Sequence, residues 1–315
     1  MRDSLKLILL AVIAIFLITV FLTIDGSGNW DYVLPRRVKK LLAFILTGAA
    51  ISISTVVFQT MTNNKILTPS LIGLDALYLL IQTVIVFVFG SAALTSMSKN
   101  VQFSLAVGLM ALFAGMLYRL LFQKNSTPLY LLLLVGVICG TFFSSISSFL
   151  QRLLNPNEFA VVQDKMFASF NNMNTDLLLT AIVLVVLILG YFYRDFAYLD
   201  VLTLGKEHAI NLGVPYQRLT KRLFIAVALL VAISTALVGP VTFLGLLVSN
   251  ITYRMLRTFR HKTVVTATVL TSISALVGGQ LVVERVFTFS TTLSVILNFV
   301  GGLYFLYMLL KENKS

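Results

Sequence analysis

Apolar runs separated by short polar segments follow one another along the chain, and their lengths are close to the roughly 20 residues that a helix needs to cross a membrane. Charged residues make up only 11% of the 315 residues, whereas a soluble domain carries about 25%. A chain with so few charges cannot cover a water-facing surface, so we expect it to lie in lipid. The ten runs are Leu5–Ile24, Lys40–Thr60, Leu71–Gly90, Val101–Leu121, Leu129–Leu150, Leu177–Tyr193, Leu223–Val238, Val241–Met255, Val264–Val282 and Leu293–Leu310. The sequence therefore predicts an all-α, polytopic membrane protein of about ten transmembrane helices, with a single domain over residues 1–315.

The first run follows two basic residues, Arg2 and Lys6, and in that respect resembles a secretion signal. Its apolar part is as long as a full span, however, and no small-residue cleavage site follows it. We therefore expect this segment to be retained as the first transmembrane helix.

Lysines and arginines are distributed unevenly between the two sides that ten spans define. With both termini in the cytoplasm, 16 of the 24 lie in inner segments and 8 in outer ones, which matches the retention of basic residues in cytoplasmic loops. The outer eight are Arg36, Arg37, Lys39, Lys40, Lys99, Arg152, Lys165 and Arg285. We therefore expect both termini in the cytoplasm. The net charge of +12 then reflects orientation, and without a basic face interleaved with aromatic residues we expect no nucleic-acid partner.

The sequence contains no recognisable chemistry of its own. Gly205-Lys206 lacks the upstream glycine and the following Ser or Thr of a phosphate-binding loop. The two histidines, His208 and His261, fall in cytoplasmic segments, and Cys139 lies alone inside an apolar run without metal-ligand spacing. No span carries the several buried charges of a proton-driven carrier. We expect no enzymatic activity, no cofactor and no metal site, and an energy source in a partner.

The longest segment expected on the cytoplasmic side, residues 194–222, mixes polar and apolar residues. Within Gly205–Leu212, the spacing of Ala209 and Leu212, with Tyr216 beyond, predicts one apolar face of a short helix. Such a helix is either a docking element for a partner protein or an interfacial helix that lies on lipid headgroups.

Four sequence blocks carry a family resemblance over nearly the whole chain. They are LPRRVKKLLAFILTGAAISISTVVFQ (34–59), NKILTPSLIG (64–73), LGKEHAINLGV (204–214) and GPVTFLGLLVSNITYR (239–254). They resemble, in order, the RLPR segment with its Gly-Ala helix, NPLAxPxxLG, LGEExAxxLGV and GPIGFVGLIVPHIxR of the permeases of ABC importers for iron–siderophore complexes, haem and cobalamin. Ala168-Ser169 is similar to a Gly-Ser pair in the middle of the same pattern.

The resemblance implies a multi-pass permease of the bacterial inner (cytoplasmic) membrane that carries an iron–siderophore complex into the cytoplasm by alternating access. Haem or cobalamin is the alternative cargo, and a secondary transporter is the rival class. In this family the third block is the helix that couples the permease to its cytoplasmic ATPase, which favours the docking interpretation of the segment. The residues that match its motif are Leu204, Gly205, Glu207, Ala209, Leu212 and Gly213.

The resemblance also offers an explanation for the basic residues on the outer side. Permeases of this family carry outward-facing arginines that pair with acidic residues of a substrate-binding protein. Arg36 occupies the arginine of the LPR motif, and Arg285 falls in the last outer loop. Simple contact with lipid headgroups is the alternative. The implied partners are cytoplasmic ABC ATPase subunits, an extracytoplasmic substrate-binding (lipo)protein, a ferric siderophore, membrane lipid and a second permease subunit.

The sequence departs from the family pattern at several positions. Val33 replaces the first arginine of RLPR, Lys65 replaces the proline of NPLA, and Ser249-Asn250 replaces Pro-His. These departures predict fewer docking contacts and softer helix breaks. They favour a heterodimer with a different second permease over a homodimer.

Small and polar residues within the expected spans are the candidates for the translocation pathway. They are Gln59, Asp75, Ser249, Asn250 and Asn298. Each either lines the pathway or bonds to a neighbouring helix. Asp75 is either a gate residue or simply close to the cytoplasmic interface.

Overall fold

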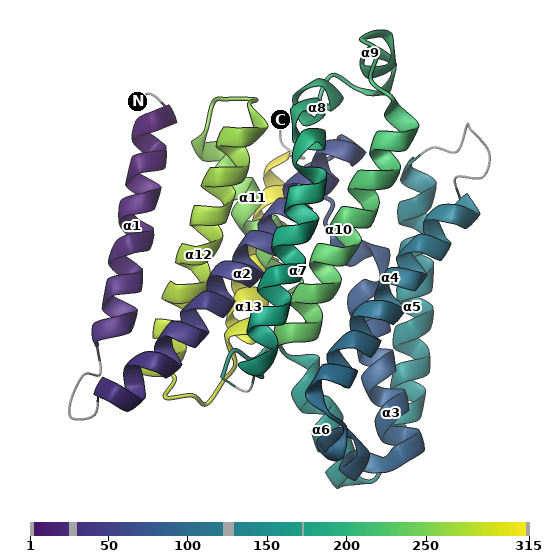
Figure 1. Ribbon diagram of the computed structural model, residues 1–315, viewed down its shortest axis with the longest axis vertical. Helices are drawn as coiled ribbons and strands as arrows, with labels where there is room; N and C mark the ends of the chain where they lie inside the picture. Colours follow the sequence, from purple (N-terminus) through teal and green to yellow (C-terminus); the bar gives the residue numbers. More distant parts are fainter. Residues whose placement is uncertain (1–2, 25–29, 122–128, 172, 313–315) are drawn as a thin grey trace.

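The computed structural model describes residues 3–24, 30–121, 129–171 and 173–312, and every regular element in these ranges is a helix. The α-helices are α1 (Asp3–Thr23), α2 (Trp30–Thr62), α3 (Leu74–Ser96), α4 (Lys99–Leu121), α5 (Leu129–Leu153), α6 (Pro156–Met166), α7 (Asp176–Phe192), α8 (Phe196–Leu202), α9 (Lys206–Asn211), α10 (Tyr216–Val238), α11 (Leu244–Met255), α12 (His261–Arg285) and α13 (Leu293–Glu312). Two 3₁₀ helices, η1 (Pro69–Ile72) and η2 (Tyr193–Asp195), join α2 to α3 and α7 to α8. The predicted all-α architecture is confirmed (Figure 1).

Eight helices in the described ranges are long and apolar enough to cross a membrane: α1 to α5, α7 with its continuation through α8, α10 and α12. The apolar part of α13 is shorter. A full span was expected at Val241–Met255, but α11 has only 12 residues. At 1.5 Å per residue it extends about 18 Å, well short of a hydrocarbon core of about 30 Å. The protein is thus polytopic, but this predicted span is a half-length helix.

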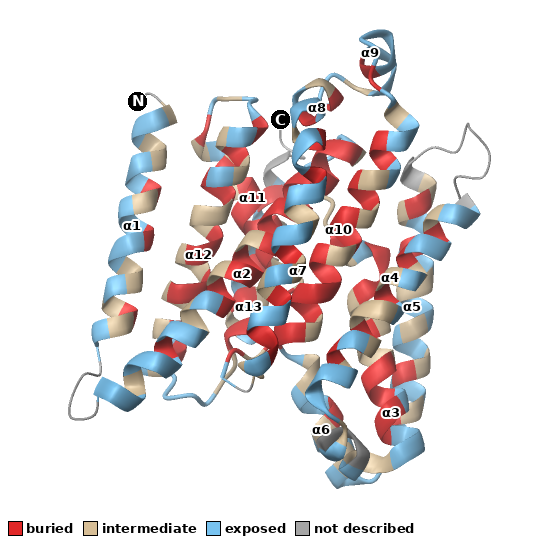
Figure 2. Ribbon diagram, in the orientation of Figure 1, coloured by how far each residue is buried: buried red, intermediate tan, exposed pale blue. Residues whose placement is uncertain are grey.

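Burial divides the spans into a central pair and a surrounding layer (Figure 2). In their most apolar windows, α2 and α10 are 78% and 72% buried, whereas α1 and α5 are 17% buried. The central pair packs together and against α12, α7 and α4. The surrounding helices expose large apolar side chains such as Phe16 and Phe149, as expected for helices that face lipid.

The chain between α2 and α3 turns back into the bundle. There η1 packs against α5. Gly73, which ends η1, lies so close to Gly140 of α5 that a Cβ on Gly73 would lie 2.8 Å from the Gly140 Cα. Gly73 also has a φ of 86°, which favours glycine. The third span was expected to begin at Leu71, but α3 begins at Leu74 because this buried joint precedes it. Non-helical backbone at membrane depth is tolerated where protein surrounds it, and Ile72 is fully buried.

The two ends of the bundle carry different elements (Figure 1). At one end, named here the α9 end, α1 begins, α13 ends and α8 and α9 protrude. At the opposite α6 end lie α6, the start of α2 and the end of α12. The first helix thus begins, and the last helix ends, at the same end of the bundle. Arg2, Lys124 and Lys314, which the charge count assigned to the inner side, lie outside the described residues.

Candidate functional site

The short helix α9 is held by a glycine on each side. Gly205 precedes it with a φ of 94°, and Gly213 follows it with a φ of 82°. The N–H of Gly213 donates to the carbonyl of Ile210 at 2.9 Å, and the N–H of Val214 donates to that of Ala209 at 3.0 Å. These two bonds form a Schellman motif, which ends a helix with a glycine in the left-handed conformation. The sequence therefore fixes both the length and the exit direction of α9.

Most residues of the protruding helix α9 are exposed (Figure 2). Leu204, Ile210 and Leu212 are 55%, 48% and 64% exposed, whereas Ala209 is fully buried. Glu207 is exposed beside them. The predicted helix is present, but the expectation that Ala209 and Leu212 share one face is wrong. Ala209 is buried, whereas Leu212 is the exposed C-cap residue that follows the last turn. Exposed apolar groups gathered at one place typically mark an interaction site.

The basic cluster expected before the second span forms the first turns of α2 at the α6 end, and two of its members bind within the protein. The buried Arg37 donates to the carbonyl oxygen of Phe21 in α1. The Lys40 Nζ donates to Asn171 Oδ1 at 2.7 Å and lies 3.9 Å from a carboxylate oxygen of Glu284 in α12. These two side chains fasten α2 to its neighbours.

The two predicted docking arginines, Arg36 and Arg285, both have exposed side chains at the α6 end. The guanidinium carbon of Arg36 lies 4.1 Å from the centre of the Tyr32 ring. Arg285 donates to the carbonyl of Ile24 at 3.3 Å. A hollow of about 690 Å³ lies beside Arg36. The four basic residues that line it, named here the basic patch, are Arg36, Arg37, Lys39 and Lys40.

Three of the predicted pathway residues are buried and hydrogen-bonded. The Gln59 Nε2 and the Asn250 Nδ2 both donate to the carbonyl of Lys65, at 2.7 Å and 3.1 Å. The Ser249 hydroxyl donates to the carbonyl of Leu246 at 3.2 Å, within α11. Gln59 and Asn250 thus hold the irregular segment after α2 against α11, and Gln59 also borders a hollow of about 310 Å³.

Asp75 lies in the first turn of α3 and buries its Oδ2. Its Oδ1 accepts a hydrogen bond of 3.2 Å from the hydroxyl of Thr235, which lies in the last turn of α10, whereas the first turn of α10 adjoins α9. The hydroxyl side chains that line the small space around it, together with apolar ones, belong to Ser54, Thr55, Thr68, Ser70, Thr235 and Thr242. Asp75 is thus separated from the α9 end by most of the length of α10. Asn298, in α13, also buries an Oδ1 that has no hydrogen-bond partner among the described residues.

A stripe of hydroxyl side chains on α5 was not anticipated. Thr141, Ser144, Ser145 and Ser148 are all exposed on this peripheral helix. Thr141 and Ser145 donate to backbone carbonyls one turn earlier, each at 2.9 Å. The signal was present in the sequence as the run TFFSSISS inside a predicted span. Small hydroxyl residues on a membrane helix are typical of surfaces that contact another helix.

These features define a polytopic helical membrane protein with a short exposed helix at one end and a basic patch at the other. The described ranges contain no group of three or more His, Cys, Asp or Glu that could hold a metal ion.

Comparison with known proteins places this chain in a family. Residues 5–311 match the FecCD transport family. The petrobactin import system permease protein YclO of Bacillus subtilis is 57% identical over 315 residues, which cover 100% of both chains. The petrobactin import system permease protein FatC of Bacillus anthracis is 35% identical over 91% of this chain and 81% of that one. The chain therefore belongs to the FecCD transport family.

A solved structure, described as a metal-chelate type ABC transporter in an inward-facing conformation, shares the fold. Its TM-score is 0.84 at 21% identity, with 98% of this chain and 100% of that chain covered. The resemblance drawn from the four sequence blocks is thus confirmed. The chain is a membrane-spanning transport component of the siderophore-importer permease family.

Proposed function

We propose that this protein is the permease subunit of an ATP-driven importer that carries ferric petrobactin across the bacterial inner membrane by alternating access. The observation that carries the proposal is the 57% identity with a petrobactin permease along the whole of both chains. A second relative named for the same siderophore supports it. Haem or cobalamin is the alternative cargo.

Energy reaches the permease through α9, which docks in a cleft of a cytoplasmic ABC ATPase. The support is the apolar tip formed by Leu204, Ile210 and Leu212, which is exposed at the end of a helix fixed by glycines. On this proposal the α9 end faces the cytoplasm, and both termini lie there. The chain itself is not an enzyme, because hydrolysis takes place in the partner.

The α6 end receives an extracytoplasmic substrate-binding lipoprotein. Arg36 and Arg285 are exposed at this end, and the basic patch is concave, which suits an acidic partner surface. Exposed ion pairs are individually worth about 0–1 kcal/mol, but several together set the register of docking and speed encounter.

A second permease chain completes the pathway across the hydroxyl stripe of α5. A pathway between two chains needs a face that lipid does not cover, and exposed hydroxyls in a membrane helix fit such a face better than lipid contact. We favour a heterodimer, with a homodimer as the alternative, because Val33, Lys65 and Ser249-Asn250 depart from the family pattern.

Uptake of radiolabelled iron tests the proposed substrate. Cells that lack this permease should lose uptake of ferric petrobactin and regain it with the intact gene, while uptake of labelled haem and cobalamin remains unchanged. Loss of haem or cobalamin uptake with petrobactin uptake intact would assign the other cargo. ATP depletion should abolish uptake, whereas collapse of the proton gradient alone should not. The reverse pattern would indicate a secondary transporter.

A further inference from the structure

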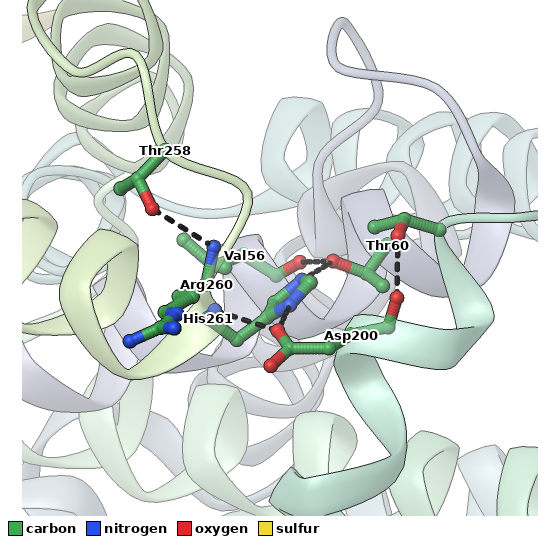
Figure 3. A network of polar contacts seen from close by, with 7 residues as sticks. Val56, Thr60, Asp200, Thr258, Arg260 and His261 are labelled. Carbon is green, nitrogen blue, oxygen red and sulfur yellow. Dashed lines mark hydrogen bonds and ion pairs between the residues drawn. The ribbon is translucent and has the colours of Figure 1, made fainter.

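A buried histidine lies where three elements of the α9 end meet (Figure 3). His261 is the first residue of α12 and is only 6% exposed. The sequence around His261 suggested no role for it, because a single histidine between two predicted spans belongs to no motif. In the structure, it is surrounded by polar contacts from two other helices.

One side of the imidazole ring binds α8. The Asp200 Oδ1 accepts a bond of 2.8 Å from the backbone N–H of His261 and lies 2.6 Å from the ring Nδ1. A carboxylate can only accept, so Nδ1 carries the proton and donates. Charge-assisted bonds of this kind are stronger than neutral ones. The Thr203 hydroxyl also donates to the Asp200 carbonyl at 2.6 Å, which secures the end of α8.

The other side of the ring binds α2. The His261 Nε2 lies 2.8 Å from the hydroxyl oxygen of Thr60, and this hydroxyl is 2.8 Å from the carbonyl of Val56 one turn earlier. Because a hydroxyl can both donate and accept, the contact forms whether or not Nε2 carries a proton. Thr60 is buried near the end of α2.

The position of this network relates it to α9. Asp200 lies in α8, which leads directly into Gly205 and α9, and α8 packs against α2, α9 and α12. The residues Asp200, His261 and Thr60 therefore connect the base of the docking helix to the most buried helix of the bundle and to the start of α12.

We propose that His261 is a positioning residue that, with Asp200 and Thr60, forms a latch transmitting the movement of α9 to α2 and α12. This inference rests on the proposed function, because it assumes that the ATPase moves α9. Because His261 belongs to α12 and its ring bonds to both α8 and α2, a displacement of α8 then moves α12 and α2 together. Without the latch the ATPase still binds, but less of its movement reaches the bundle.

The test is transport in proteoliposomes that contain the complete importer, with ferric petrobactin loaded on its binding protein. Asp200→Ala removes the α8 arm of the latch, and Thr60→Val removes the α2 arm while preserving shape. Coupling between sites is typically worth about 5- to 150-fold. We therefore expect each variant to transport at least about fivefold less iron per ATP hydrolysed, with ATPase subunits still co-purifying. Asp200→Asn and Thr60→Ser keep an acceptor or a hydroxyl and should restore most of the ratio.

The double variant, Asp200→Ala with Thr60→Val, distinguishes one connection through His261 from two independent contacts. Because both arms act through His261, the combined loss should be smaller than the product of the two single losses. Thr258→Val is the matched control, since the Thr258 hydroxyl accepts a bond from the Arg260 N–H within the neighbouring loop and, among the described residues, forms no hydrogen bond to α8 or α2. It should leave the ratio unchanged.

Either of two results would overturn the latch: an unchanged iron-to-ATP ratio in both single variants, or loss of ATPase binding in them. The proposed function fails differently, because its failure appears as intact ATPase binding and uptake in Glu207→Arg or Gly213→Trp. If Asp200→Ala does not reach the membrane in normal amount, Thr60→Val and Thr60→Ser decide the question alone.

Discussion

The two ends of the bundle offer partners different kinds of surface. At the α9 end, apolar side chains stand on a short helix that two glycines fix in place. At the α6 end, the exposed Arg36 belongs to the concave basic patch, in which Arg37 and Lys40 are bound to α1 and α12. Apolar contact drives lasting association, whereas exposed charges mainly govern encounter and register. The α9 end thus suits a partner that remains bound, and the α6 end one that arrives and leaves.

Charging the α9 tip is expected to have the largest effect. Ile210→Asp with Leu212→Asp puts two carboxylates where apolar side chains would enter the ATPase cleft. Truncating a central interface residue costs about 2 kcal/mol or more, so the double variant should bind the ATPase at least about 30-fold more weakly. Co-purification and titration with purified ATPase measure this. Asn211→Asp adds a charge without removing an apolar group, and should have little effect. Normal ATPase affinity in the double variant would exclude an apolar dock.

The glycine before α9 is expected to have the next largest effect. At Gly205, φ is 94° and ψ is 165°, a region that is essentially confined to glycine and costs other residues about 1–3 kcal/mol. A Cβ there meets open space, so Gly205→Ala tests backbone strain alone. We expect ATPase affinity to fall about tenfold. Gly190→Ala is the matched control, because Gly190 also has open space around it but lies in a regular helix. Equal losses in both variants would show that the conformation of Gly205 does not matter.

Reversing the charges at the α6 end is expected to weaken a different partner, and by less. Arg36→Glu with Arg285→Glu replaces two exposed attractions by repulsions, so the dissociation constant for the binding protein should rise about tenfold at low salt. The difference should shrink as salt screens the charges. Arg152→Glu changes an exposed arginine at the end of α5, and should leave the affinity unchanged. A salt-independent loss, or none, would contradict electrostatic docking.

The sequence predicted the helices whose formation depends only on a long apolar run in a lipid bilayer. Because a backbone in hydrocarbon must satisfy its hydrogen bonds internally, long apolar runs such as those in α1, α4 and α5 became helices close to the expected bounds. The α9 helix was also predicted, from the spacing of apolar residues in one short block, although Ala209 and Leu212 do not share a face.

Features that depend on contacts distant in sequence were not predicted. The inward course of the chain after α2 needs Gly73 against Gly140 and an Asn250 side chain that binds the Lys65 carbonyl from 185 positions away. The early start of α2 was concealed because its first turns carry a proline and four basic residues. The polar contacts of His261 were not predicted because they join it to helices distant in sequence. The exposure of the α5 hydroxyls was not predicted because it depends on which face of α5 the neighbouring helices cover.

The aromatic ring under Arg36 is expected to have the smallest effect. An exposed cation–π contact is worth about 0.5–1 kcal/mol, so Tyr32→Leu should weaken binding-protein affinity about two- to fivefold. The ring restricts the guanidinium to one region, which lowers the entropy that docking must remove. The charge remains, so the salt dependence of binding should match that of the unmodified protein, unlike in Arg36→Glu. Tyr32→Phe keeps the ring and should retain most of the affinity. A weaker salt dependence in Tyr32→Leu would contradict this explanation. It would show that loss of the ring removes the electrostatic contribution of Arg36 to binding, and not only the restriction of its position.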